Sequence, residues 1–193
     1  MRTYVLKYWF IGFLFIPMIL FSQRTDKYNS IYEGYFKAEE LYSHLQYGAA
    51  KKEYRDFINS CNNPNDPLYQ KALYYEGVSA LELYNFDAIP LLMEYNRLYP
   101  ENIHRKMISF KIGRFFFHDQ SYDDAQLWFE KITAADLDSS YREEYHFKMG
   151  YCALQNGIKE LAIKVFRENI NGKSQYAAPS KYFFAHLCYE RGS

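Results

Sequence analysis

The chain has few of the residues that interrupt helices or build loop-rich folds. Its 193 residues include only nine glycines and six prolines, which disfavours an all-β or loop-rich protein. Cysteine is equally scarce, and Cys61, Cys152 and Cys188 are too few and too widely spaced for a disulfide framework. Because Cys152 and Cys188 stand among apolar residues, we interpret both as buried free thiols.

The sequence also lacks an excess of charge of one sign. The 23 Lys and Arg residues balance 23 Asp and Glu residues, which gives no electrostatic signature of binding to nucleic acid or anionic lipid. Apolar residues, in contrast, form 49% of the chain and aromatic residues 20%, mostly Tyr and Phe. This composition indicates a folded protein with a sizeable core, because disordered chains carry too few apolar residues to bury.

No apolar run reaches the roughly 20 residues of a membrane-spanning helix. The apolar stretch over residues 9–20 is shorter, is interrupted by Pro17, and follows the basic residues Arg2 and Lys7. This pattern predicts a secretory signal peptide over residues 1–22, cleaved after Ser22, and its junction resembles signal peptides of some Gram-negative bacteria. An uncleaved N-terminal anchor is the alternative. Both predict that the rest of the chain is exported, to the periplasm or cell envelope, with residues 23–30 as a leader.

A pattern of small and large apolar residues recurs after residue 30. Its small residues are Ala38, Gly77, Gly113, Gly150 and Ala185, at steps of 39, 36, 37 and 35. In the first four copies, an apolar residue that is usually Ala follows twelve positions later, and a large apolar residue follows four beyond it. These two series are Ala50, Ile89, Ala125 and Ala162, and then Tyr54, Met93, Phe129 and Phe166.

This pattern resembles the tetratricopeptide repeat, a helix–turn–helix unit of roughly 34 residues. The resemblance implies an all-α fold without strands: a right-handed superhelix of antiparallel helical hairpins, a TPR-like solenoid of about four and a half repeats. Small residues on the first helix would let the second helix approach closely. The repeat domain is expected over residues 31–193, with units near 31–65, 70–102, 106–138 and 143–173 and an incomplete unit at 178–193.

Turn-forming residues between these units support the helix boundaries. Segments rich in Asn, Asp, Pro, Gly or Ser occur at residues 62–67, 99–102, 136–140 and 171–174, and such residues favour turns over helix interiors. Pro90 is compatible with a helix if Asp87 precedes the first turn, where the missing N–H of a proline is tolerated.

The candidate binding residues follow from the same resemblance, because the first helix of each unit lines a concave groove in that family. The fifth position of this helix is aromatic in every copy: Tyr35, Tyr74, Phe110, Phe147 and Tyr182. Two interpretations stay open, since the rings either pack between units or form a ladder that holds a partner. Positions nine and twelve are expected to point further into the groove, with Glu39, Arg114 and Tyr151 at the ninth and Tyr42, Phe117 and Tyr189 at the twelfth. Arg114, a charge among phenylalanines, is the first choice for a contact, and its alternative is a solvated charge.

No catalytic constellation accompanies the repeat. The sequence has no His-Glu-x-x-His, no Cys-x-x-Cys and no Gly-rich phosphate loop, so we expect no enzymatic activity, metal or cofactor. The resemblance predicts a scaffold that binds a protein or peptide, with a membrane-associated envelope complex among its partners. One alternative is a recruiting or regulatory region of a larger enzyme or secretion component that continues beyond Ser193, because the helix near 178–193 would lack a partner. A glycan binder ranks last, since nothing predicts a closed pocket.

Overall fold

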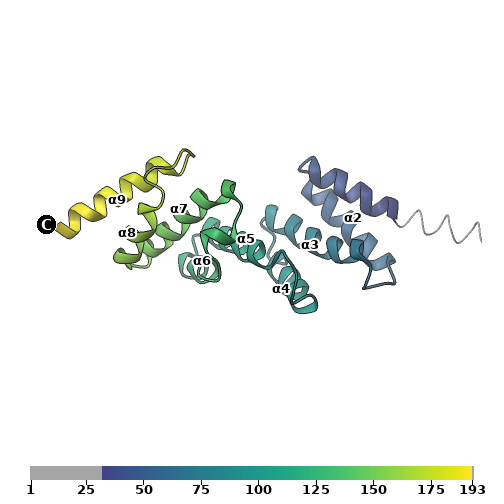
Figure 1. The fold of residues 1–193 in the computed structure, drawn as a ribbon. Coiled ribbons are helices and arrows are strands. Elements are labelled where there is room, and N and C mark those ends of the chain that lie inside the picture. The colour runs from purple at the N-terminus through teal and green to yellow at the C-terminus, as the bar shows by residue number, and fades with distance from the viewer. Residues whose placement is uncertain (1–31, 193) are drawn as a thin grey trace, which may run out of the picture. The chain divides into compact units, whose positions relative to one another are not determined.

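The computed structural model describes residues 32–192, and every regular element in this range is a helix (Figure 1). After a helix over residues 32–43, the elements are α2 (Tyr47–Ser60), α3 (Pro67–Glu82), α4 (Ala88–Leu98), α5 (Arg105–His118), α6 (Tyr122–Phe129), the short 3₁₀ helix η1 (Ala134–Asp136), α7 (Ser139–Gln155), α8 (Lys159–Arg167) and α9 (Ala177–Gly192). The prediction of an all-α chain is therefore confirmed for residues 32–192. The predicted signal peptide (1–22) and leader (23–30) lie outside the described residues.

The chain divides into two compact units, the first ending at Leu91 and the second beginning at Leu92, within α4. Two of the four turn-rich segments expected from the sequence, at residues 99–102 and 171–174, lie between helices. The other two overlap helices at their ends, because α3 already begins at Pro67, Asp136 is the last residue of η1 and α7 begins at Ser139.

Local signals account for where two of the helices begin. The Asp66 carboxylate accepts a hydrogen bond of 2.8 Å from the backbone N–H of Leu68, and Pro67 occupies the first helical position of α3. Helix α4 begins directly after Asp87, which places Pro90 in the first turn as expected. The Asp87 carboxylate itself pairs with Lys51, whose Nζ lies 2.7 Å from Oδ2.

The turns that connect the two helices of each repeat of the sequence pattern share the same backbone conformation. Each turn contains a residue with positive φ, seven positions after the small residue of the sequence pattern: Leu45, Tyr84, Gln120 and Gly157, with φ of 60°, 54°, 61° and 75°. The next residue donates its N–H to the carbonyl five positions earlier, at 3.0 Å from Ser121 to Phe116 and 2.8 Å from Ile158 to Ala153. This Schellman arrangement satisfies carbonyl groups at the end of the helix.

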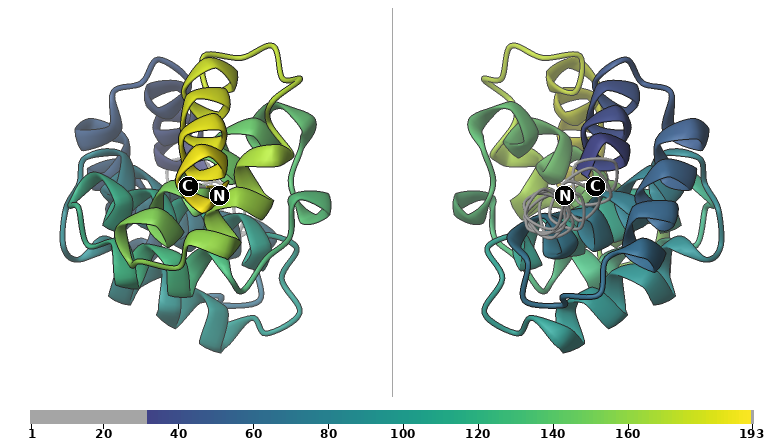
Figure 2. Two further views of the ribbon diagram at one scale, coloured as in Figure 1. Left: turned by 90° about the vertical axis from the view of Figure 1, so that its left-hand side faces the viewer. Right: turned by 90° about the vertical axis from the view of Figure 1, so that its right-hand side faces the viewer.

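Close approach of paired helices determines the packing of the second unit. Helices α5 and α6 lie side by side, as do α7 and α8 (Figures 1 and 2). A β-carbon added to Gly113 would lie 2.6 Å from Cε1 of Phe129, and one added to Gly150 would lie 2.9 Å from Cδ1 of Phe166. Both glycines therefore allow the contact expected from the sequence, because a larger residue would meet a buried ring.

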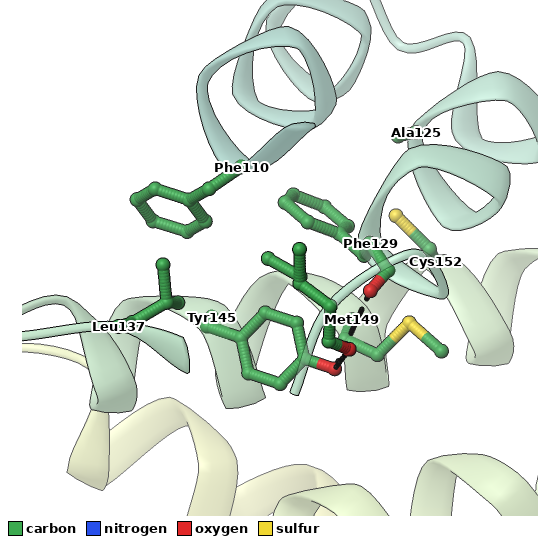
Figure 3. Packing of buried hydrophobic residues seen from close by; sticks show 8 residues of the cluster. Phe110, Ala125, Phe129, Leu137, Tyr145, Met149 and Cys152 are labelled. Carbon is green, nitrogen blue, oxygen red and sulfur yellow. Dashed lines mark hydrogen bonds between the residues drawn. The ribbon is translucent and has the colours of Figure 1, made fainter. Parts of the chain in front are cut away.

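The same rings connect each pair of helices to the next helix. Phe129 packs edge-on against Tyr145 of α7, with ring centres 6.0 Å apart, in the buried cluster shown in Figure 3. The hydroxyl of Tyr145 donates to the carbonyl of Ile132 at 3.1 Å, so its polar end is satisfied inside the core. Phe166 stacks on Phe183 of α9, with ring centres 5.5 Å apart.

The three cysteines are free thiols, and their burial differs. Cys152 is buried, as predicted, in the cluster shown in Figure 3, while Cys188, which we expected to be buried, is half-buried. Burial raises the pKa of the Cys152 thiol to about 12, so this side chain stays protonated at neutral pH and is chemically inert.

The first unit has a core of aromatic rings. Tyr35, Tyr54 and Phe57 are buried there together with Ala38 and Ala50. The ring of Tyr54 stacks on Tyr75 of α3, with centres 5.8 Å apart and planes 17° apart. Tyr54 thus connects its own pair of helices to the following helix, as Phe129 and Phe166 do in the second unit.

The Gly113–Phe129 contact predicts the effect of a single methyl group. Gly113→Ala should lower the free energy of unfolding by about 1–3 kcal/mol, because the ring of Phe129 must move within a packed core. The matched variant Gly48→Ala has no heavy atom within 4 Å of the new β-carbon and should be neutral or up to about 1 kcal/mol more stable. Urea unfolding followed by circular dichroism measures both, and equal effects of the two substitutions would contradict a tight contact between Gly113 and Phe129.

The positive φ of the turns predicts opposite effects for two turn substitutions. Gln120→Gly should raise the free energy of unfolding by about 1 kcal/mol, whereas Gly157→Ala should lower it by about 1 kcal/mol, because side chains disfavour left-handed backbone. Gln70→Gly, inside α3, is the control for loss of a glutamine side chain and should lower stability by about 0.5–1 kcal/mol. Thermal and urea unfolding of the three variants test the signs, and destabilisation by Gln120→Gly would refute the strain argument.

Candidate functional site

The second unit contains a half-buried cluster of charged and aromatic side chains where α5 meets α7. We name it the α5–α7 surface, and its members are Arg114, Phe117, Glu144, Phe147, Lys148 and Tyr151. Four of the six, namely Arg114, Phe117, Phe147 and Tyr151, are candidate residues predicted from the sequence.

Two cations converge on one carboxylate in this surface. The Nε of Arg114 lies 2.8 Å from Oε1 of Glu144, and the Nζ of Lys148 lies 3.6 Å from the same oxygen. Glu144 is only 8% exposed, whereas the side chain of Arg114 is 35% exposed. The cluster therefore carries one positive charge in excess of its carboxylate, and part of that charge faces solvent.

Both cations also lie on aromatic faces. The Nζ of Lys148 is 4.2 Å from the ring centre of Phe117, and the guanidinium carbon of Arg114 is 5.9 Å from that of Phe110. Burial lowers the pKa of Lys148, and the charge of Glu144 opposes this effect. The aromatic rings and Glu144 thus hold two positive charges in a partly desolvated position. Electrostatic interactions of a charge are stronger there than in water.

Aromatic rings of this surface and of the neighbouring helix α9 form a continuous row across three helices. Phe117 contacts Tyr151 with ring centres 5.7 Å apart, and Tyr151 contacts Phe183 of α9 at 5.6 Å. Tyr176, just before α9, stacks on Phe147 at 5.5 Å. Burial is the main cause that raises the pKa of Tyr176 above its ordinary value, so its hydroxyl stays protonated and can donate or accept a hydrogen bond.

The remaining candidates of the second unit lie elsewhere. Phe110 is fully buried in the core, where it contacts Phe129 and Tyr141. Tyr182 and Tyr189 are 65% and 77% exposed on α9. The ring of α9 that continues the aromatic row is Phe183, the neighbour of the predicted Tyr182.

The candidates of the first unit form a separate cluster. Tyr35 is fully buried, and its hydroxyl donates to Glu39 at 2.7 Å. Burial, and then Glu39, raise the pKa of Tyr35 above its ordinary value. Tyr42 packs edge-on against Tyr75 at 5.0 Å, and Tyr74 is buried beside Tyr75. Tyr35, Tyr74 and Phe110 are therefore packing residues, which is the first of the two interpretations of the aromatic residues at the fifth position. Glu39 and Tyr42 are half-exposed.

Sequence reasoning missed Glu144, Lys148, Tyr176 and Phe183. A signal was present for two of them, since Glu144 and Lys148 stand four residues apart and therefore on one helix face. The other two depend on how α9 and the loop before it pack on α7, which a repeat pattern does not specify.

In comparisons with known proteins, no family model matches the sequence, and no curated protein matches it. Within residues 32–192, no group of three or more His, Cys, Asp or Glu side chains could hold a metal ion. In the same range, every helix is too short or too polar to cross a membrane. The tetratricopeptide-repeat resemblance thus remains a prediction, and function is inferred from the α5–α7 surface.

Because Arg114 and Lys148 share the carboxylate of Glu144, we expect a substitution of Glu144 to lower the stability of the protein. Glu144→Gln leaves Arg114 and Lys148 without a counter-charge in a half-buried position, so the free energy of unfolding should fall by about 1–3 kcal/mol. The control is Glu94→Gln, because Glu94 pairs with Arg97 at 2.6 Å on an exposed helix face. Exposed pairs contribute little, so this control should unfold like the wild type in urea. A Glu144→Gln variant as stable as the control would show that the ion cluster is energetically unimportant.

Proposed function

We propose that the chain is a non-catalytic scaffold that binds a peptide or a segment of another protein across the α5–α7 surface. The observation that carries this proposal is the combination of a positive charge excess and a row of half-buried rings in one place. Tyr, Trp and Arg are the residue types most enriched at binding hot spots.

The chemistry of the surface indicates what it would recognise. A guanidinium has five N–H donors in a planar fork, and the contact of Arg114 with Glu144 through Nε does not use up this capacity. The rings of Phe117 and Tyr151 beside it offer an apolar platform. A suitable ligand segment therefore carries a carboxylate or several carbonyl groups next to an aromatic or aliphatic side chain.

We further propose that the helical pairs are units of a TPR-like, right-handed superhelix of about four and a half repeats, whose concave groove includes this surface. The recurring turn geometry at Leu45, Tyr84, Gln120 and Gly157 supports equivalent units. The glycine–phenylalanine contact shared by α5–α6 and α7–α8 supports the same conclusion. The signal-like sequence of residues 1–22 supports an exported scaffold, acting in the bacterial periplasm or cell envelope on a protein partner found there.

A peptide library tests the binding proposal directly. The purified chain is screened against a random display library, and the affinity of enriched peptides is measured by fluorescence anisotropy. Arg114→Gln keeps a hydrogen-bonding side chain beside Glu144 but removes the cation, so it should weaken binding by roughly tenfold or more. Arg97→Gln is the matched control, because Arg97 also pairs with a glutamate but lies on the exposed face of α4.

The outcome distinguishes binding at the α5–α7 surface from non-specific binding. Enriched peptides should share acidic and aromatic or aliphatic residues, and their affinity should be unchanged by Arg97→Gln. Equal losses in the two variants, or no enriched peptide at all, would contradict the proposed site. Thermal melting of both variants shows whether any loss of binding reflects unfolding instead.

A further inference from the structure

Helix α9 packs against its unit through one side only. Ser180 and Leu187 are buried on that side, and Phe183 contacts both Phe166 of α8 and Tyr151 of α7. In the left view of Figure 2, α9 lies nearest the viewer, and no other described helix of its unit covers it. The opposite side of α9 is therefore open to solvent.

The residues on this open side follow a regular pattern. Tyrosines occupy positions 182 and 189, and small residues occupy positions 178, 185 and 192, so each type repeats every seven residues. Each tyrosine stands three residues before a small residue, which is the spacing of the a and d positions of a heptad. All five residues are exposed, and we name this set, Ala178, Tyr182, Ala185, Tyr189 and Gly192, the α9 seam. A heptad seam is the feature by which helices pair with other helices.

The same unit shows how such a seam is filled. Gly113 and Gly150 each receive an aromatic ring from the partner helix, Phe129 and Phe166 respectively. Ala185 follows Gly150 by one 35-residue step of the sequence pattern. A helix that binds the α9 seam should therefore place aromatic rings on the small residues of the seam. It should also place small residues against the two tyrosines of the seam.

We propose that the helix bound to the α9 seam is α9 of a second copy, paired in antiparallel orientation. If Tyr182 lies opposite Ala185 of the second copy, Tyr189 lies opposite Ala178 of that copy, because both tyrosines and both alanines are seven residues apart. The two-fold symmetry of such a pair doubles each contact, giving four rings that rest on four small residues. Lys181 and His186 flank the seam and are exposed, so these polar side chains stay at the solvated edge, as in coiled coils.

The surface area that the α9 seam can bury limits the affinity of this dimer. Tyr182 and Tyr189 are 65% and 77% exposed, so the four rings of a dimer would bury on the order of 500 Å². Stable complexes bury about 1,200 Å² or more. The dimer should therefore be weak, with a dissociation constant in the micromolar range or above, and its population should depend on concentration.

Sedimentation velocity of the full chain tests this proposal over roughly 1–500 μM, a range chosen for micromolar affinity. The wild type should shift from monomer to dimer as its concentration rises. Ala185→Arg places a charge in the middle of the seam and should raise the dissociation constant by about tenfold or more. Ala49→Arg introduces the same side chain at an exposed position of α2 and should dimerise like the wild type. Circular dichroism verifies that both variants fold.

Disulfide trapping tests the orientation independently of Ala185→Arg. Ala178→Cys and Tyr189→Cys chains, each also carrying Cys61→Ser and Cys188→Ser, are mixed and oxidised. Antiparallel pairing should cross-link position 178 of one chain to position 189 of the other, with little linkage between two copies of either variant alone. A wild type that stays monomeric throughout, equal dimerisation of Ala185→Arg and Ala49→Arg, or cross-links mainly between two 178 positions would each overturn the proposal.

Discussion

The second unit depends on the contact between a glycine and an aromatic ring. Gly113 lets α6 approach α5 so closely that Phe129 lies directly on the backbone, and Gly150 does the same for Phe166 of α8. Each ring then reaches the following helix, at Tyr145 or at Phe183. One side chain therefore connects three helices, and packing of this kind stabilises a stack of helices without a separate central core.

The position of the α5–α7 surface follows from that packing. Because Phe129 bridges α5–α6 to α7, the helices α5 and α7 come close enough for Arg114 to reach Glu144 at 2.8 Å. The ring of Phe117 lies in the same region, where it contacts Tyr151 and lies beneath the ammonium group of Lys148. The polar contact between Arg114 and Glu144 thus depends on the apolar contacts that Phe129 makes between the same helices.

Much of the fold was predictable because it depends on residue size at regular spacing. The small residues, the large apolar residues that follow them and the turn-rich segments indicated an all-helical chain, but not every boundary, since α7 begins at Ser139 inside a segment predicted as a loop. The turns themselves were less predictable, since Leu45, Tyr84 and Gln120 adopt positive φ without being glycine. The site was predicted in part: Arg114, Phe117, Phe147 and Tyr151 lie together, but Glu144 and Lys148 were missed. Which face of a helix is half-buried depends on the angle to its neighbours, and a pattern of small and large residues does not specify that angle.

The recurring turns have a consequence for how the chain reaches its fold. Each turn closes through hydrogen bonds between residues five or fewer positions apart, and the first contact between paired helices joins residues as near in sequence as Gly113 and Phe129. Proteins dominated by such local contacts fold quickly, because little chain entropy is lost before contacts form. A hairpin of this kind can assemble as soon as its own residues are available, for example while the rest of the chain is still being synthesised.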